Sequence, residues 1–273
     1  MEKKRKKIFL YIFLALFLLI IVIWTSVKPS NDRDWTLDQK ILPYSVQEGN
    51  IINIYNIRNF TYYNTSIYYP SYYNKTFNLS QLDSVWYIVE PFSNWEGSAH
   101  TFLSFGFNDS YIAVSVEIRK EKGEQFSPVK GLFKQYEIMY VLGDEEDLIK
   151  LRSNYRNDSV YVYPVNTTQE TMQLLFIDIL NHTNKLYTAP EFYNSISNTC
   201  TTNIAKHANH IRPGRIPFSF AILAPGYSDR FAYNLGIINT TLPYEEIRTH
   251  YKINERALKY ANSSDFSLRI REF

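Results

Sequence analysis

The residue best suited to covalent chemistry in this sequence is Cys200, the only cysteine among 273 residues. It follows the polar run SISNT and begins the run CTTNIAKHANHI, whose spacing predicts a helix that starts at or just before the cysteine. The N-terminus of a helix stabilises a thiolate and lowers the pKa of the thiol, as nucleophilic cysteines require. The alternative is a buried free cysteine that packs as a small apolar side chain.

A hairpin is predicted about a hundred residues earlier. Two strand-like runs, 100–107 and 110–119, are separated by Asn108 and Asp109. These two residue types favour tight turns because they tolerate left-handed backbone and form local hydrogen bonds. With a two-residue turn, the numbers of directly opposed residues add up to 217.

This register places His100 opposite Glu117 on one face of the hairpin. Ser115 and Arg119 share that face and are candidate supporting residues. An imidazole beside a carboxylate is typical of a general base whose orientation the carboxylate holds. A slip of one residue would separate the pair, and an exposed polar face that merely contains both residues is the alternative.

The His207-x-x-His210 pair lies seven and ten residues after Cys200. In a helix this is about 10–15 Å, too far for direct proton exchange with the thiol. The pair also lacks the further ligands of a zinc site, so we predict no metal.

Of the remaining histidines, His182 and His250 have no carboxylate predicted beside them, whereas His100 has one. The constellation consistent with these positions is Cys200 as nucleophile, His100 as base and Glu117 as the residue that orients the imidazole.

Strands and helices are predicted on both sides of these residues. Strand patterns cover residues 50–63, 84–92, 136–142 and 159–165. A short helix is predicted at 144–154 and a longer one at 167–187, which opens with the capping box Thr167-x-x-Glu170 and carries an apolar stripe. The Tyr-rich run 64–76 and the Pro- and Gly-rich run 213–226 are predicted to be loops.

The composition is that of a folded chain with both strands and helices, which predicts an α+β class. Hydrophobic residues make up 45% of the chain and aromatic residues 16%, enough for a packed core. The net charge is only +2, and no basic stripe follows the N-terminus. We therefore predict that nucleic acid is not a partner of this protein.

The N-terminus predicts a membrane anchor. MEKKRKK precedes an unbroken apolar run of 17 residues, from Ile8 to Trp24, and about 17–25 residues span a bilayer. A cleaved signal peptide is the alternative, but its apolar region is about 7–15 residues long and ends at an A-x-A-like site, which TSVKPS lacks. The positive-inside rule places the N-terminus in the cytoplasm.

These features divide the chain into four predicted parts. They are a cytoplasmic basic segment at 1–7, a transmembrane anchor at 8–25, a stalk at 26–50 and an extracytoplasmic domain at 51–273. Ten Asn-x-Ser/Thr sequons occur between Asn59 and Asn262. They indicate a glycoprotein if the host is a eukaryote or a eukaryotic virus, and a bacterium with Asn-rich proteins is the alternative.

Several stretches carry a family resemblance, from about Asn53 to the C-terminus. AHTFLSFGF, SVEIRKEKGEQFSPVKGLFKQYEIMYVLGDEEDLIKLR, VYVYP, EFYNSISNTCTTNIAKHAN and LAPGYSDRFAYNLGII resemble the Lnb N-terminal periplasmic domain family. Bacterial members are implicated in lipoprotein N-acylation. The sequence departs from them in having one N-terminal anchor in place of a larger membrane portion.

The order of the candidate residues is also similar to that of permuted papain-like enzymes of the NlpC and lecithin:retinol acyltransferase type. In those enzymes a histidine and a polar partner on adjacent strands precede a helix-borne cysteine. The resemblance implies a papain-like α+β fold with an antiparallel sheet, and it carries His100, Glu117 and Cys200 over as a triad.

The resulting expectation is a thiol acyltransferase that works through a thioester, with no cofactor. The backbone N–H of Cys200, together with Asn198, is expected to stabilise the oxyanion. A membrane-tethered domain suits the bilayer and a lipid or lipoprotein substrate. Two alternatives stay open: a cysteine amidase or peptidase of the same fold, acting on a peptide or amide, and a catalytically silent surface binding module.

Overall fold

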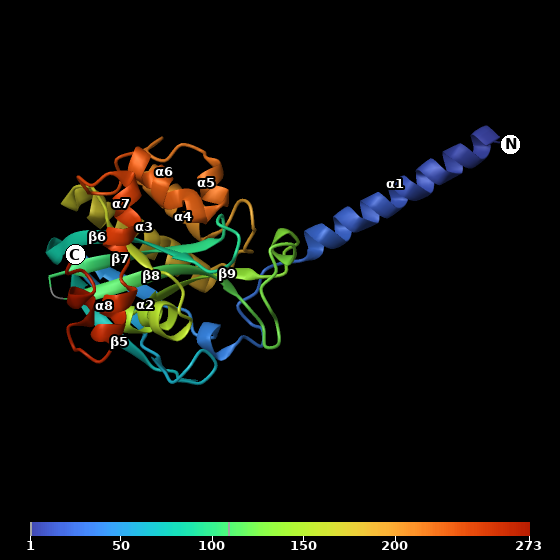
Figure 1. Cartoon of the computed structure of the whole chain (residues 1–273). Helices are drawn as coiled ribbons and strands as arrows, with labels where there is room; N and C mark the ends of the chain where they lie inside the picture. Colours follow the sequence, from blue (N-terminus) through green and yellow to red (C-terminus); the bar gives the residue numbers. More distant parts are fainter. Residues whose placement is uncertain (1, 109) are drawn as a thin grey trace.

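A mixed β-sheet lies at the centre of the protein, and helices cover both of its faces (Figure 1). The computed structural model describes residues 2–108 and 110–273. In this part of the chain the sheet has eight strands in the order β1-β2-β9-β8-β7-β6-β10, with β5 paired to β2. The strands are β1 (Tyr44–Glu48), β2 (Ile51–Arg58), β5 (Tyr72–Asn78), β6 (Leu82–Pro91), β7 (Ala99–Phe107), β8 (Ser110–Arg119), β9 (Glu137–Gly143) and β10 (Tyr161–Pro164).

The predicted α+β class is confirmed, whereas the prediction of an antiparallel sheet is only partly right. Neighbouring strands are antiparallel except β2 and β9, which pair in parallel where Arg58 meets Gly143. Because β2 and β9 are far apart in the sequence, no turn motif between them could predict this pairing. The prediction that the arrangement is papain-like stays a prediction.

The central hairpin has the predicted register. Phe102 pairs with Ser115 and Phe107 with Ser110, so opposed residue numbers add up to 217. Asn108 has a positive φ of 54°, a conformation that asparagine tolerates better than most residues. Asp109, the second residue of the predicted turn, lies outside the described residues.

Two helices cover the face of the sheet that carries the larger core. They are α3 (Gln169–Thr188) and α4 (Cys200–Ile211). The predicted stripe on α3 packs into this core, with Phe176 completely buried. The N-cap lies one residue later than predicted, because Thr168 rather than Thr167 accepts the capping hydrogen bond, from the N–H of Thr171.

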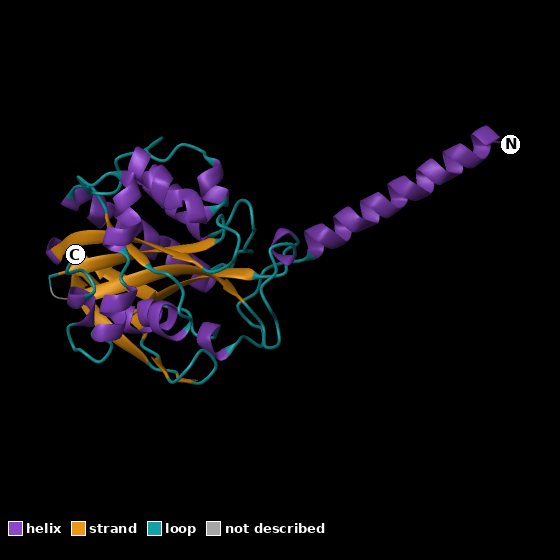
Figure 2. Cartoon of the chain, viewed as in Figure 1, coloured by secondary structure: helices purple, strands orange, loops and turns teal. Residues whose placement is uncertain are grey.

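The opposite face is covered by α2 (Glu145–Lys150), which continues as a π-helix over Leu151–Tyr155, and by α8 (Asn254–Lys259) and α9 (Phe266–Arg269). Figure 2 shows the resulting order of layers, with helices on both sides of the strands. The remaining short helices are α5 (Phe220–Leu223), α6 (Ser228–Asn234) and α7 (Tyr244–Tyr251).

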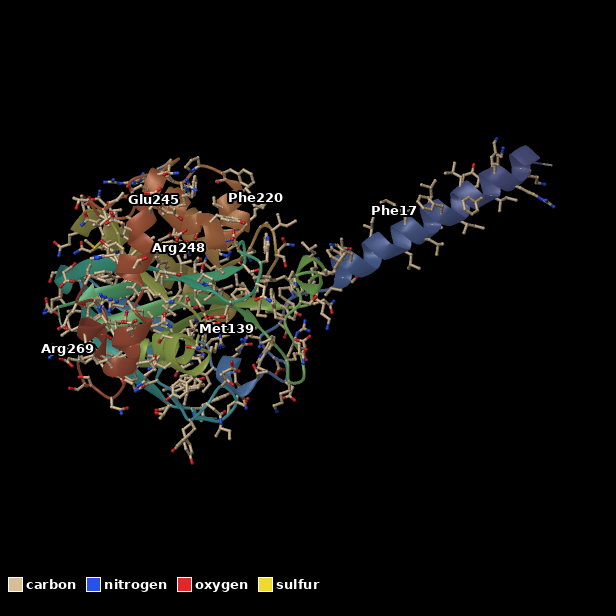
Figure 3. All side chains as sticks on the ribbon, viewed as in Figure 1. Phe17, Met139, Phe220, Glu245, Arg248 and Arg269 are labelled. Atoms are coloured by element: carbon tan, nitrogen blue, oxygen red, sulfur yellow. The ribbon has the colours of Figure 1, made fainter. Side chains whose placement is uncertain are left out.

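The apolar N-terminal run forms one long helix, α1 (Glu2–Ser26). It is long and apolar enough to cross a membrane. Figure 3 shows Phe17 on the part of α1 that extends away from the domain. This agrees with an anchor whose side chains are covered by lipid.

The predicted stalk and one predicted loop contain strands that belong to the folded domain. Residues 26–50, predicted to be a stalk, contain β1, which pairs with β2, and Trp35, which is 4% exposed. The predicted loop 64–76 contains β4 (Tyr68–Tyr69), which pairs with β3 (Thr61–Tyr62), and most of β5. The first departure is a missed hairpin, because β1 and β2 are joined by a two-residue turn at Gly49 and Asn50. The second arises because β5 pairs with β2, which is not its neighbour in the sequence.

Candidate functional site

Three elements meet at one end of the sheet. His100 lies near the start of β7, Glu117 near the end of β8, and Cys200 is the first residue of α4. All three line one cleft of about 270 Å³, together with Tyr193 and Arg152. The structure therefore brings the predicted triad together, from residues a hundred positions apart.

The start of α4 is held firmly in place. Thr199 is the N-cap, and its side chain and that of Thr202 form a reciprocal capping box. The hydroxyl groups of Thr101 and Thr201 are 2.9 Å apart, which ties the first turn of α4 to β7 beside His100. Cys200 thus sits at the positive end of the helix dipole, as predicted.

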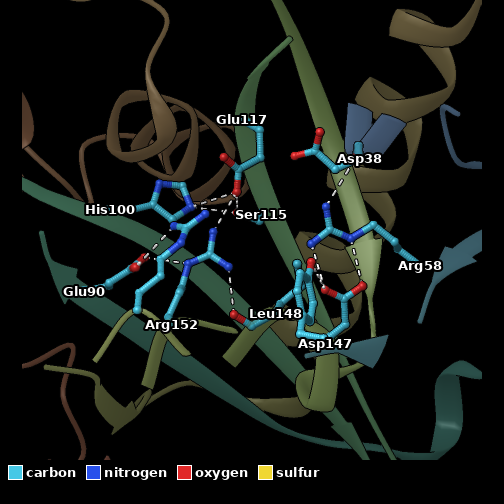
Figure 4. A network of polar contacts seen from close by, with 11 residues as sticks. Asp38, Arg58, Glu90, His100, Ser115, Glu117, Asp147, Leu148 and Arg152 are labelled. Carbon is cyan, nitrogen blue, oxygen red and sulfur yellow. Dashed lines mark hydrogen bonds and ion pairs between the residues drawn. The ribbon is translucent and has the colours of Figure 1, made fainter. Parts of the chain in front are cut away.

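A hydroxyl group bridges the imidazole and the carboxylate (Figure 4). The Ser115 hydroxyl donates to Glu117 Oε1 at 2.6 Å, so it accepts from His100 Nε2 at 2.7 Å. His100 Nε2 is itself 3.3 Å from Glu117 Oε1. Because Nε2 faces Ser115 and Glu117, Nδ1 is the ring nitrogen left for Cys200, which lines the same cleft.

The packing of the ring fixes this orientation. The imidazole stacks on Phe102, with ring centroids 5.6 Å apart. The side chain of His100 is 14% exposed and that of Glu117 23%, so water reaches the pair from the cleft only. The aromatic ring and the carboxylate together fix the orientation of the imidazole in the cleft.

The charges of the site favour a thiolate beside an imidazolium. Burial raises the pKa of Cys200, but the positive charge and hydrogen bond of His100 outweigh it, and the pKa falls from 9.0 to about 7. Burial lowers the pKa of His100, but Glu117 and Cys200 outweigh it and raise the pKa to about 10. Between these values the nucleophile is ionised and its neighbour holds a proton.

A buried arginine that the sequence did not indicate holds the carboxylate. Arg152 Nη2 donates to Glu117 Oε1 at 2.9 Å, and Arg152 Nε donates to Glu90 Oε2 at 2.5 Å. Glu90 lies opposite His100 on β6. Burial raises the pKa of Glu117, but His100, Arg152 and Ser115 hold it well below its usual range.

Arg152 reaches the site because it stands on the π-helix that follows α2. Turns of this kind are rare and recur at functional sites. Neither Arg152 nor Glu90 belongs to a spacing motif, so only the tertiary structure reveals them.

Two predicted supporting residues lie elsewhere. The guanidinium of Arg119 donates to the carbonyl oxygens of Gln39 and Lys40 and stacks on Trp35, so it holds the N-terminal segment to the domain. Asn198 donates through Nδ2 to the carbonyl oxygen of Phe192, so this amide holds the loop before α4. Neither side chain lines the cleft.

The other histidines also lie apart from the thiol. His207 and His210 on α4 each place Nδ1 2.7 Å from an oxygen of Asp178. His182 stacks on Tyr140, and His250 contacts Tyr251. Among the described residues, no group of three or more His, Cys, Asp and Glu side chains has the geometry of a metal site.

We expect the rate of Cys200 alkylation by iodoacetamide to rise with pH through a midpoint near 7. The sign follows from the lowered pKa, because below 7 the thiol is protonated and unreactive. In His100→Ala the midpoint should move upward, since burial then acts on the thiol without an opposing positive charge. The measurement is the alkylation rate of the full chain between pH 5 and pH 10.

His210→Ala is the matched control for that experiment. It also removes an imidazole, but His210 is exposed and paired with Asp178. An unchanged midpoint in His100→Ala would contradict the assignment of His100 as the residue that ionises the thiol.

The comparisons with known proteins identify the family of the chain. The Lnb N-terminal periplasmic domain family matches residues 68–226, a range that contains His100, Glu117 and Cys200. No curated protein and no solved structure matches the chain significantly. Because the family match covers more than half of the chain and α1 is long and apolar enough to cross a membrane, the protein is a membrane-anchored extracytoplasmic domain that belongs to the Lnb N-terminal periplasmic domain family.

Proposed function

We propose that the protein is a cysteine-dependent acyltransferase that works through a thioester acyl-enzyme. The observation that carries the proposal is that Cys200, at the start of α4, lines one cleft with His100, whose imidazole Ser115 and Glu117 hold. A permuted papain-like arrangement, in which paired strands present a histidine to a helix-borne cysteine, is the fold that we propose with it.

In the first half-reaction the Cys200 thiolate attacks the carbonyl carbon of an ester or amide. The negative charge moves to the carbonyl oxygen, which the backbone N–H of Cys200 at the start of α4 stabilises. The carbonyl re-forms, the bond to the leaving group breaks, and His100 gives its proton to the leaving alcohol or amine. A thioester on Cys200 remains.

In the second half-reaction His100, now neutral, takes a proton from the acceptor. The acceptor, an amine or water, attacks the thioester carbon, and Cys200 leaves as the thiolate. An amine gives a new amide and makes the enzyme a transferase, whereas water gives a carboxylic acid. Throughout, Glu117 keeps the imidazole oriented and offsets its positive charge.

The proposal also includes the class of substrate and the orientation of the chain in the membrane. A domain on a single anchor suits a lipid or lipoprotein as substrate, because both are present at the surface to which it is tethered. We propose that the basic segment before the apolar run keeps the N-terminus in the cytoplasm.

The direct test is to trap the acyl-enzyme. The full chain is incubated in detergent micelles with a phospholipid ester and no amine, quenched in acid, and digested for mass spectrometry. We expect the peptide that contains Cys200 to gain the mass of one acyl group, which neutral hydroxylamine removes because it cleaves thioesters. Adding a peptide with a free N-terminal amine should move the acyl group to that amine.

The other readings give different results in this experiment. Release of free fatty acid with no transfer to the amine identifies a hydrolase. A peptide or amide that acylates Cys200 when phospholipid does not identifies an amidase or peptidase. If none of these donors forms an adduct, although the thiol is intact and the chain is folded, the result indicates a surface binding module.

We expect Glu117→Gln to lower the rate of acyl transfer by about 10- to 10⁴-fold, less than loss of Cys200 or His100. The amide keeps the shape of the side chain but removes the negative charge that raises the pKa of His100. The measurement is kcat as a function of pH, in which the alkaline limb should move to lower pH. Glu121→Gln, just beyond β8, is the matched control, and equal losses in both variants would count against the orienting role.

A further inference from the structure

Three connections that contribute residues to the cleft also carry exposed apolar side chains. The connections are residues 92–98 between β6 and β7, residues 120–136 between β8 and β9, and residues 189–199 before α4. Six of these side chains are between 45% and 64% exposed: Phe92, Trp95, Phe126, Val129, Phe133 and Ile196. Phe92 and Phe126 also line the cleft itself. We call these six residues the apolar rim.

Two of the connections support each other. The backbone N–H of Ser195 donates to the carbonyl oxygen of Gly131 at 3.3 Å, and the Ser195 hydroxyl donates to the carbonyl oxygen of Pro128 at 2.7 Å. Residues 127–133 and the loop before α4 therefore form one continuous surface. Exposed apolar groups gathered in this way mark a surface that binds a partner or a membrane.

The end of the membrane anchor touches the same surface. The ring of Trp24, near the C-terminal end of α1, packs edge-on against Phe133 with centroids 6.0 Å apart. Lys134 Nζ donates to the carbonyl oxygen of Trp24 at 2.9 Å. Figure 1 shows the connection between β8 and β9 beside the point where α1 reaches the domain.

The link between the anchor and the catalytic end of the sheet is short. Only residues 27–29 separate the end of α1 from Ser30, whose N–H donates to the carboxylate of Glu137. A link of this length spans about 14 Å at most. Glu137 pairs with Arg119, two residues along β8 from Glu117, or about 7 Å.

We infer that the apolar rim rests in the surface of the lipid bilayer, with the cleft opening toward it. The short link keeps this end of the domain next to the membrane, and apolar side chains at such a position enter the boundary between headgroups and acyl chains, about 5–10 Å deep. This inference concerns position alone. If the proposed acyl transfer is also correct, the donor is a membrane lipid whose ester carbonyl reaches Cys200 without leaving the bilayer.

The test uses the full chain in vesicles of phosphatidylethanolamine and phosphatidylglycerol, with a fluorescent label on a single cysteine. Cys200→Ser removes the native thiol, and Val129→Cys and Ile196→Cys each place the label on the apolar rim. Leu268→Cys is the matched control, since Leu268 is also exposed and apolar. It is next to Arg269, which Figure 3 shows on the side of the domain away from α1.

We expect lipids with brominated acyl chains to quench the labels at Val129 and Ile196 and to leave the label at Leu268 unchanged. Absence of quenching at the two rim positions, or equal quenching at all three, would overturn the inference. The labels at the two rim positions could instead be shielded in proportion to the number of protein copies per vesicle, with no dependence on the bromine content. That result would overturn the inference and indicate an interface between copies of the chain. The measurement needs no catalysis, so failure of the proposed function leaves it unaffected.

Discussion

Cys200→Ala and His100→Ala are each expected to lower the rate of acyl transfer by on the order of 10⁶-fold, the loss known for a nucleophile or base that acts as part of a unit. Cys200→Ala removes the atom that carries the acyl group. His100→Ala removes the positive charge and hydrogen bond that bring the pKa of the thiol to about 7, and the proton donor for the leaving group. The measurement is kcat for the full chain, and the double variant should be no slower than either single one.

Both variants should keep the fold. Cys200 is only partly buried, and it lines the cleft. After His100→Ala the carboxylate of Glu117 still accepts hydrogen bonds from Ser115 and Arg152, so no charge is left buried alone. Thermal unfolding should therefore change little. His210→Ala is the control that should keep full activity, and substantial turnover in Cys200→Ala would exclude the thioester route.

Arg152→Leu is expected to lower the free energy of unfolding by about 3–5 kcal/mol, the usual cost of leaving a buried ion without its partner. Arg152 is 3% exposed and holds Glu90, which is 1% exposed, and Glu117. Glu90 would keep its charge and lose the Arg152 donor, and Glu117 would lose one of its donors but keep Ser115. In a chain of this size the unfolding temperature should fall by roughly 10 °C, as measured by circular dichroism in detergent.

The matched control is Arg156→Gln on the same segment. Arg156 is 46% exposed, and its nitrogen is 3.7 Å from Glu90, so its removal should change stability very little. Adding Glu90→Gln to Arg152→Leu should recover part of the lost stability, because it removes the buried charge that loses its Arg152 donor. Equal stability of the Arg152 and Arg156 variants would show that the buried network is not what holds Glu117.

The hairpin and the cysteine helix were predictable because their signals are local. Asn108 ends one strand and Ser110 starts the next, and this spacing sets which residues face each other across the pair. A polar cap ahead of a periodic run likewise sets where a helix begins, and α4 begins at Cys200. Each signal lies within a few residues of the feature that it predicts.

The features that the sequence predicted wrongly depend on contacts with segments outside their own sequence window. Residues 72–76 belong to a Tyr-rich run that looks like a loop, yet β5 forms there because it pairs with β2, on the other side of the β3–β4 pair in the sequence. Arg119 shares a face with Glu117 on β8, yet its guanidinium turns to carbonyl groups of residues 39 and 40. In both cases the outcome depends on which distant segment arrives alongside, and a single sequence carries no measure of that.

By itself the sequence determined the apolar anchor, the α+β class, the opposition of His100 and Glu117, and the place of Cys200 at a helix start, because these follow from periodicity, turn chemistry and capping within short windows. Only the tertiary structure decided that α4 docks on β7 through Thr101 and Thr201, and so brings Cys200 into one cleft with His100. It also decided that Arg152 crosses from a π-helix to Glu117, and that the anchor reaches the domain at the apolar rim. The reason is physical: these contacts join segments tens to more than a hundred residues apart, and packing of the whole core selects them.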